Sequence, residues 1–269
     1  MPSKANGPQP AVRSGLPGIE AEFGPHAAGW MSTRGGGVSA GPWASLNLGD
    51  HVGDDPAAVA CNRQRLVAAL GVRPVYLRQV HGIEVVAVGP DTPDGLTADA
   101  CYTDTPGVAC TVLVADCLPI LLATAEGGSV AAVHAGWRGL SAGVLEALVA
   151  TWPAVRQPAA RAACHVWIGP AIGVQAFEVG PEVRQAFLAQ APEDAVAFEP
   201  SPDHPGRWRA DLAALARARL RRLGFERVCG HDGSAAWCTA SQPSTFFSHR
   251  RDAAALGASG RMAACVWRF

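Results

Sequence analysis

The sequence carries little charge of either sign. Charged residues make up 17% of the 269 residues, and the formal net charge is -1. Proteins that bind nucleic acids usually present a basic surface, so this balance argues against a nucleic-acid partner. The arginines between residues 217 and 222 fall on a strongly helical stretch. We expect them to form a solvated helix face.

Long uninterrupted apolar runs are also absent. The most apolar window, residues 108–125, is broken by Asp116 and Pro119, which favours two buried strands over a membrane span. The first twenty residues lack the apolar centre of a secretory signal, so we expect a cytoplasmic protein without membrane association. In that reducing compartment the eight cysteines are expected to be buried, metal-bound or catalytic.

No tandem repeat and no long polar linker divides the chain. Residues 1–22 are rich in proline, glycine and polar residues, which predicts a flexible N-terminal tail. The remaining residues, 23–269, are expected to form one domain.

Strand and helix signals alternate through that domain. Asp54, Asp55 and Pro56 predict the start of a helix that ends at Gly71. Strand-like segments cover residues 75–79, 83–88, 108–115, 119–124, 129–135, 164–168 and 263–269, and helix-like segments cover 141–151, 179–190 and 210–224. Interleaved in this way, they predict an α/β or α+β fold with a mixed β-sheet core and flanking helices.

Three potential metal ligands fall at predicted strand ends or connections: His81, Cys117 and His134. Two imidazoles and a thiolate suit zinc, and three protein ligands leave a fourth position open for catalysis. A single His or Cys at such a place is more often structural. Cys117 beside His134 is equally compatible with a nucleophile and its base, as in a thiol hydrolase, while Asp116 could orient a ligand or cap a turn.

Other polar residues could bind a ligand. In "GWRGL", Arg138 offers a guanidinium fork that suits phosphate, or it is a plain loop arginine. In "FFSHRRD", Arg250 and Arg251 could line an anion site or form a surface salt bridge with Asp252. Asn47 lies in a glycine-punctuated loop, where its side chain could bind a ligand or satisfy a turn.

Eight blocks, in order, resemble one known family. They are "SLNLGDHVGDDPAAVACNRQRL", "LRQVHG", "ADACYTD", "ADCLPILLA", "AAVHAGWRGL", "IGPAIGVQAFEVG", "CTASQPSTFFSHRRD" and "SGRMAACVW". From about Phe23 to the C-terminus, the chain resembles the YfiH family, also called the laccase-domain or multicopper polyphenol oxidase family and now regarded as purine nucleoside phosphorylases. The resemblance implies a mixed α/β fold similar to the catalytic domains of cytotoxic necrotizing factors.

The resemblance also implies an activity and a cofactor. It implies zinc bound by His81, Cys117 and His134, with copper as a possible substitute. The implied reactions are phosphorolysis of adenosine, inosine, guanosine and methylthioadenosine to free base and ribose 1-phosphate, together with adenosine deamination. The partners would be purine nucleosides and inorganic phosphate, for a monomer or small homo-oligomer.

Phosphorolysis needs phosphate held at the sugar and support for the departing base. We therefore expect Arg138, Arg250 or Arg251 to hold phosphate. Asn47 and Gln79 are expected to contact ribose or base, and Phe177 to stack on the ring. For deamination, Asp116 or a histidine would move the proton.

Three other functions compete with this hypothesis. A laccase needs about ten histidines, several in His-X-His pairs, whereas this chain has eight histidines and no such pair. The thiol hydrolase remains an alternative because of Cys117 and His134. A non-catalytic binding protein would be favoured if the purified protein held no metal and turned over no nucleoside.

Overall fold

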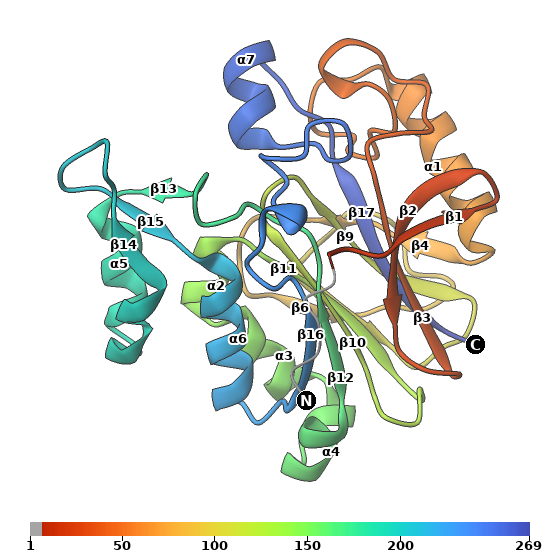
Figure 1. Cartoon of the computed structure of the whole chain (residues 1–269). Coiled ribbons are helices and arrows are strands. Elements are labelled where there is room, and N and C mark those ends of the chain that lie inside the picture. Colours follow the sequence, from red (N-terminus) through yellow and green to blue (C-terminus); the bar gives the residue numbers. More distant parts are fainter. Residues whose placement is uncertain (1–6) are drawn as a thin grey trace.

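The computed structural model in Figure 1 describes residues 7–269 and is centred on two six-stranded sheets. The strand order of the first sheet is β1 (Pro10–Arg13), β2 (Leu16–Glu22), β3 (Ala27–Ser32), β17 (Met262–Arg268), β9 (Val108–Val114) and β4 (Arg73–Val75). The second runs β16 (Arg227–Gly230), β12 (His165–Ile168), β10 (Leu118–Ala123), β11 (Val130–Ala135), β8 (Ala100–Thr103) and β6 (Val85–Ala87). Both sheets mix parallel and antiparallel pairs, which confirms the predicted class.

The described helices and the smaller strands surround these sheets. The helices are α1 (Pro56–Leu70), α2 (Trp137–Ala142), α3 (Val144–Thr151), α4 (Pro158–Ala163), α5 (Pro181–Leu188), α6 (Leu212–Arg222) and α7 (Ala254–Leu256). Short helical turns are η1 (Gly41–Trp43), η2 (Pro153–Val155), η3 (Pro192–Ala197), η4 (Ala235–Trp237) and η5 (His249–Ala253). Two small sheets pair β13 (Glu178–Val179), β15 (Trp208–Ala210) and β14 (Phe198–Pro200), and β5 (Leu77–Arg78) with β7 (Leu96–Thr97).

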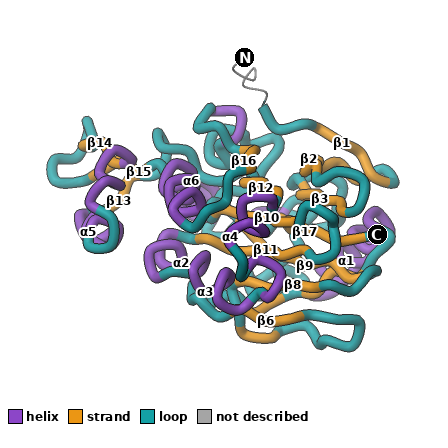
Figure 2. The backbone as a smooth tube through the Cα atoms, turned by 90° about the horizontal axis from the view of Figure 1, so that it is seen from below, coloured by secondary structure: helices purple, strands orange, loops and turns teal. Residues whose placement is uncertain are grey.

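The two large sheets pack face to face between layers of helices. Side chains alternate along β10, so Leu121 packs toward the first sheet while Ile120 and Leu122 pack toward α3 and α6. On the outer face of the first sheet, α1 covers another apolar cluster through Leu66 and Leu70. Figure 2 shows α2, α3 and α6 on one side of the strands and α1 on the other. Strands buried on both faces explain the apolar window.

Local signals placed α1 correctly. Asp55 caps its N-terminus by accepting a hydrogen bond from the Ala57 N–H at 3.0 Å, and Pro56 is its first residue. The helix ends at Gly71, whose φ of 69° suits a residue without a Cβ. Within residues 7–269, no helix is both long enough and apolar enough to cross a membrane.

The expectation of a flexible tail over residues 1–22 is wrong from residue 10 onward. Strands β1 and β2 extend the first sheet, and Leu16 and Ile19 are buried. Gly18 weakened the strand signal in the sequence, yet the sheet requires it, because a Cβ there would lie 2.0 Å from the Trp30 ring. Residues 1–6 lie outside the described part of the chain.

The expected solvated arginine face on α6 is only partly present: Arg221 and Arg222 are exposed, but Arg217 and Arg219 are not. Arg219 is buried and donates to Glu146 at 2.6 Å, while Arg217 donates to the backbone carbonyls of Gly230 and His231. Arg222 forms two hydrogen bonds with the buried Asp194. These arginines therefore attach α6 to neighbouring elements.

Candidate functional site

Two connections and one strand bring His81, Cys117 and His134 together. Cys117 lies in the tight connection between β9 and β10, and the β10–β11 register places Pro119 opposite His134. His81 lies in the connection between β5 and β6. One ligand atom of each residue lies within 4.8 Å of the others, and Cys117 Sγ is 3.7 Å from His81 Nε2. The polar breaks in the apolar sequence therefore meet at one end of the sheet.

The carboxylate of Asp99 holds both histidines. This fully buried residue accepts hydrogen bonds from the backbone N–H groups of Val80, His81 and Gly82, at 2.7 to 3.1 Å. It also lies 2.7 Å from His134 Nδ1. With Nδ1 donating to Asp99, His134 presents Nε2 as a ligand. Burial raises the pKa of Asp99, but the hydrogen bonds from His134 and Gly82 outweigh it and lower the pKa.

The backbone at His81 depends on the same carboxylate. His81 has a φ of 60°, a left-handed conformation that is unfavourable for a residue with a side chain. Three consecutive N–H groups around it converge on Asp99. Asp99 therefore fixes a ring orientation in His134 and a backbone conformation in His81. Reading the sequence did not assign Asp99 a role, although it lies in the quoted "ADACYTD" block.

The thiol and imidazole of the group shift one another's pKa. Burial alone would raise the pKa of Cys117, but His134 and His81 outweigh burial and lower it to about 6. Burial would lower the pKa of His134, but Cys117 and Asp99 raise it to about 9. At a pH between these two pKa values, Cys117 is a thiolate and faces the imidazolium of His134. A thiolate is the form of cysteine that binds metal or acts as a nucleophile.

Glycines in "HAGWRG" let α2 approach the group closely. A Cβ on Gly136 would lie 2.7 Å from His81 Cδ2 and 3.0 Å from Cys117 Sγ. A Cβ on Gly139 would lie 2.8 Å from the Gly82 carbonyl oxygen. Both positions require glycine because of this close approach, not because of their φ angles.

Beyond α2 lies a hollow of about 360 Å³ that contains two of the predicted phosphate ligands. Arg138 is exposed and stacks on Trp137 at 4.5 Å. Arg250 is exposed, lies 5.6 Å from the Phe177 ring centroid, and donates to backbone carbonyls of β13 and the residues before it. A larger hollow of about 480 Å³, at the far end of β10 and β11, contains none of the predicted site residues.

Four predicted substrate contacts prove to be occupied within the fold. Asn47 is fully buried, with its amide bonded to Gly49, Asp54 and Arg261. The Gln79 amide pairs with the backbone N–H and carbonyl of Leu113. These contacts satisfy backbone groups. Asn47 is therefore closed off from ribose or base in this structure, whereas a contact of the half-buried Gln79 with either stays a prediction.

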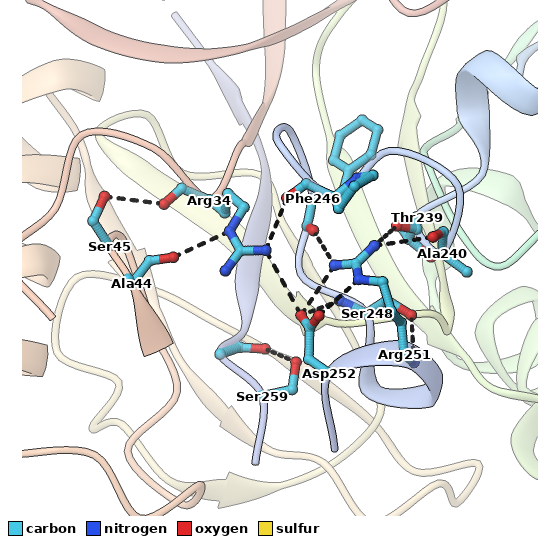
Figure 3. Close-up of polar contacts among 12 residues, drawn as sticks. Arg34, Ala44, Ser45, Thr239, Ala240, Phe246, Ser248, Arg251, Asp252 and Ser259 are labelled. Carbon is cyan, nitrogen blue, oxygen red and sulfur yellow. Dashed lines mark hydrogen bonds and ion pairs between the residues drawn. The ribbon is translucent and has the colours of Figure 1, made fainter. Parts of the chain in front are cut away.

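Arg251 and Asp116 are the other two predicted substrate contacts whose side chains already bind groups of the protein. Figure 3 shows Arg251 donating to Asp252 and to the carbonyls of Thr239, Ala240 and Phe246. The Asp116 carboxylate accepts three hydrogen bonds from residues 239–250. Arg251 is therefore not free to hold phosphate, and Asp116 is not placed to move a substrate proton. Phe177 is buried in the core and faces Arg250.

A family model described as multi-copper polyphenol oxidoreductase laccase matches residues 28–269. The chain belongs to this laccase family. A purine nucleoside phosphorylase of Pseudomonas aeruginosa is 50% identical over 88% of this chain and 91% of its own length. The purine nucleoside phosphorylase YfiH of Escherichia coli is 47% identical over 89% of this chain and 93% of its own.

Solved structures of similar chains share the fold. A Neisseria meningitidis protein is 43% identical, with a TM-score of 0.84 over 93% of this chain and 98% of its own. YlmD from Geobacillus stearothermophilus is 33% identical, with a TM-score of 0.81 over 99% of this chain and 97% of its own. This chain therefore shares its fold with both solved structures.

His81, Cys117 and His134 fit a single bound metal ion better than they fit the several copper ions of a multicopper laccase. Nitrogen and sulfur donors, a carboxylate behind one imidazole, and an exposed His81 side are features of a catalytic zinc site. Among residues 7–269 this is the one group of three such ligands. The blue and trinuclear sites of a multicopper laccase require more ligands than this group supplies.

Proposed function

We propose that this protein is a zinc-dependent purine nucleoside phosphorylase of the cytoplasm that also deaminates adenosine. Its substrates would be adenosine, inosine, guanosine or methylthioadenosine, with inorganic phosphate. The observation that carries the proposal is the His81, Cys117 and His134 group beside an arginine-lined hollow. The names of the 41–50% identical relatives support the phosphorylase part of this proposal.

The arginines supply the phosphate half of the reaction. Arg138 and Arg250 both border the hollow, and their guanidinium groups can hold a phosphate dianion through charge-assisted hydrogen bonds. Each is stacked on an aromatic ring, which restricts its position. A phosphate fixed in this way would face the sugar carbon that it attacks, and orientation of this kind lowers a barrier substantially.

Apolar and metal-binding residues would bind and activate the purine base of the nucleoside. Val80 and Ile83, which flank His81, are 53% and 40% exposed and offer apolar surface to a purine ring. Zinc held by His81, Cys117 and His134 would supply a Lewis acid near that ring. Asp99 keeps His134 oriented toward the metal position. Copper would bind the same ligands, because it follows zinc closely in ligand preference and exceeds it in affinity.

One observation favours a second candidate, a thiol hydrolase. Asp99, His134 and Cys117 form a chain of carboxylate, imidazole and thiol, which is the order of a nucleophilic triad. Zinc bound to Cys117 would block that chemistry. The phosphorylase therefore requires Cys117 to be bound to the metal, whereas the thiol hydrolase requires Cys117 to be free.

The test is chromatography of adenosine incubated with the purified protein, with and without phosphate, alongside elemental analysis. We expect about one zinc per chain, adenine release that requires phosphate, and inosine without phosphate. Cys117→Ala should lose zinc and both activities, whereas Cys229→Ser, at an exposed cysteine, should retain them. Full turnover by a metal-free Cys117→Ala protein would refute the phosphorylase. An activity that appears after zinc removal and disappears on alkylation of Cys117 would favour the thiol hydrolase.

A further inference from the structure

Asp116 links the β9–β10 connection, which also carries Cys117, to a distant segment of the chain. It directly precedes Cys117 and has a φ of 86°, a left-handed conformation that aspartate tolerates better than most residues. Its Oδ1 accepts a hydrogen bond from Thr239 Oγ1 at 2.6 Å. Its Oδ2 accepts from Ser248 Oγ at 3.1 Å and from the Arg250 N–H at 2.7 Å. Asp116 is 8% exposed, so these contacts are largely shielded from solvent.

The segment it holds, residues 239–252, is stiffened from within by a second carboxylate. Asp252 accepts from the Ser248 N–H and from the Arg251 guanidinium, and Arg34 lies 3.9 Å away. Arg251 reaches back to carbonyls at residues 239, 240 and 246. Figure 3 shows this network around Asp252. The segment therefore behaves as one unit, and Asp116 attaches it to the β9–β10 connection.

That attachment sets the position of Arg250. The Asp116 carboxylate holds its backbone N–H, and its side chain extends to the hollow beside Phe177. In the part of the chain described by the structure, the hydrogen bonds of its guanidinium to protein use Nη1. Its Nε and Nη2 remain for an anion. Asp116 is thus the residue directly before Cys117, and its carboxylate also accepts a hydrogen bond from Arg250.

We propose that Asp116 is a positioning residue that couples phosphate binding at Arg250 to the metal ligand Cys117. The inference rests on the proposed function, because it takes inorganic phosphate as the anion in the hollow. Asp116 itself touches neither phosphate nor nucleoside. A change in its hydrogen bonds moves Arg250 relative to the metal position, and orientation errors of about 1 Å reduce rates by as much as 10²-fold.

The clearest variant is Thr239→Val, which removes one donor to Asp116 while keeping the shape of a fully buried side chain. Thr239→Ser restores the hydroxyl and is the conservative rescue. Ser248→Ala removes the second hydroxyl donor and gives an independent test. Ser241→Ala removes an exposed hydroxyl from the same segment and is the matched control.

Four quantities are measured for each protein: the dissociation constant of inorganic phosphate by calorimetry, KM for phosphate and kcat in the phosphorolysis of adenosine, and zinc per chain. We expect Thr239→Val and Ser248→Ala to weaken phosphate binding and raise KM for phosphate by roughly 3- to 30-fold, with smaller changes in kcat. Zinc content should stay at the wild-type value. Thr239→Ser and Ser241→Ala should match the wild type.

An unchanged phosphate dissociation constant in both Thr239→Val and Ser248→Ala overturns the coupling, as does a Thr239→Ser variant no better than Thr239→Val. Calorimetry separates this result from failure of the proposed function. Wild-type protein that binds phosphate without cleaving nucleoside refutes the phosphorylase, and the variants still test the coupling by their phosphate affinity. Wild-type protein that binds no phosphate overturns both.

Discussion

At the residue scale, the site depends on two buried carboxylates that hold its other residues in place. Asp99 orients His134 and the backbone around His81, and Asp116 holds the segment that carries Arg250. Both are buried and accept several hydrogen bonds, which is how a fold keeps an anion charged away from water. The groups left facing the open side are the ligands and the arginines.

Replacing Asp99 tests that division of roles. In Asp99→Asn, one oxygen becomes an NH₂ group that faces backbone N–H donors, so His134 and His81 lose their common acceptor. We expect zinc affinity to fall by about 10- to 100-fold, measured by competition with a coloured chelator. Asp104→Asn, at an exposed carboxylate beyond the other end of β8, is the control. Equal zinc affinity in both variants would contradict the role given to Asp99.

The Cys117 thiol provides a test by pH. Its lowered pKa, about 6, means that the thiolate is lost as pH falls through 6 and is already formed at pH 7. In zinc-stripped protein we therefore expect the rate of iodoacetamide alkylation at Cys117 to reach half its maximum near pH 6. An ordinary cysteine reaches it at about 8.5. Peptide mass analysis assigns the site, and a rate still rising between pH 7 and 8.5 would contradict the paired thiolate.

Residue chemistry explains what the sequence could and could not predict. His81, Cys117 and His134 could be found because few residue types bind zinc and all three lie at strand ends or in connections between strands. Asn47 and Arg251 were misjudged because an amide or guanidinium looks the same whether it serves a ligand or the backbone. The role of Asp99 depends on three N–H groups that converge only after folding.

At the element scale, the close approach of α2 to the ligands is the decisive packing feature. The β10–β11 hairpin fixes Cys117 against His134, and α2 begins immediately after β11. Gly136 and Gly139 let the chain turn into α2 within contact of the His81 connection. This junction could be predicted as a glycine-flanked loop, but the need for glycine appears only in the packing.

Gly136→Ala should damage the site while sparing the fold. The added Cβ would lie 2.7 Å from His81 Cδ2 and 3.0 Å from Cys117 Sγ, so one ligand must move. Because metal sites tolerate displacements of only about 0.5 Å, we expect zinc affinity to fall at least about tenfold. The circular dichroism spectrum should be unchanged. Gly89→Ala, where a Cβ meets open space, is the control; normal zinc binding by Gly136→Ala would count against the geometry.

At the scale of the whole molecule, the N-terminal strands complete the first sheet. The fold class was predictable because strand and helix periods alternate clearly through residues 54–269. Strands β1 and β2 were missed because their proline and glycine residues give turn signals. Strand β1 pairs with β2, β2 pairs with β3, and β3 in turn pairs with the C-terminal β17. Long-range pairing of this kind has no local signature.

The buried part of β2 can be tested by stability. Ile19 is 3% exposed and packs between the sheets, so Ile19→Ala should lower the free energy of unfolding by about 2–5 kcal/mol. Val12 on β1 is 70% exposed, and Val12→Ala should change it by less than about 0.5 kcal/mol. Urea unfolding followed by fluorescence measures both. Equal stability of the two variants would restore the flexible-tail interpretation.

The most direct test of the central claim is a zinc titration of stripped protein in phosphate buffer with adenosine. If His81, Cys117 and His134 hold the metal that the reaction needs, adenine release should rise in proportion to added zinc and level off at about one zinc per chain. Stripped protein that releases adenine as fast as the reloaded protein would contradict the claim.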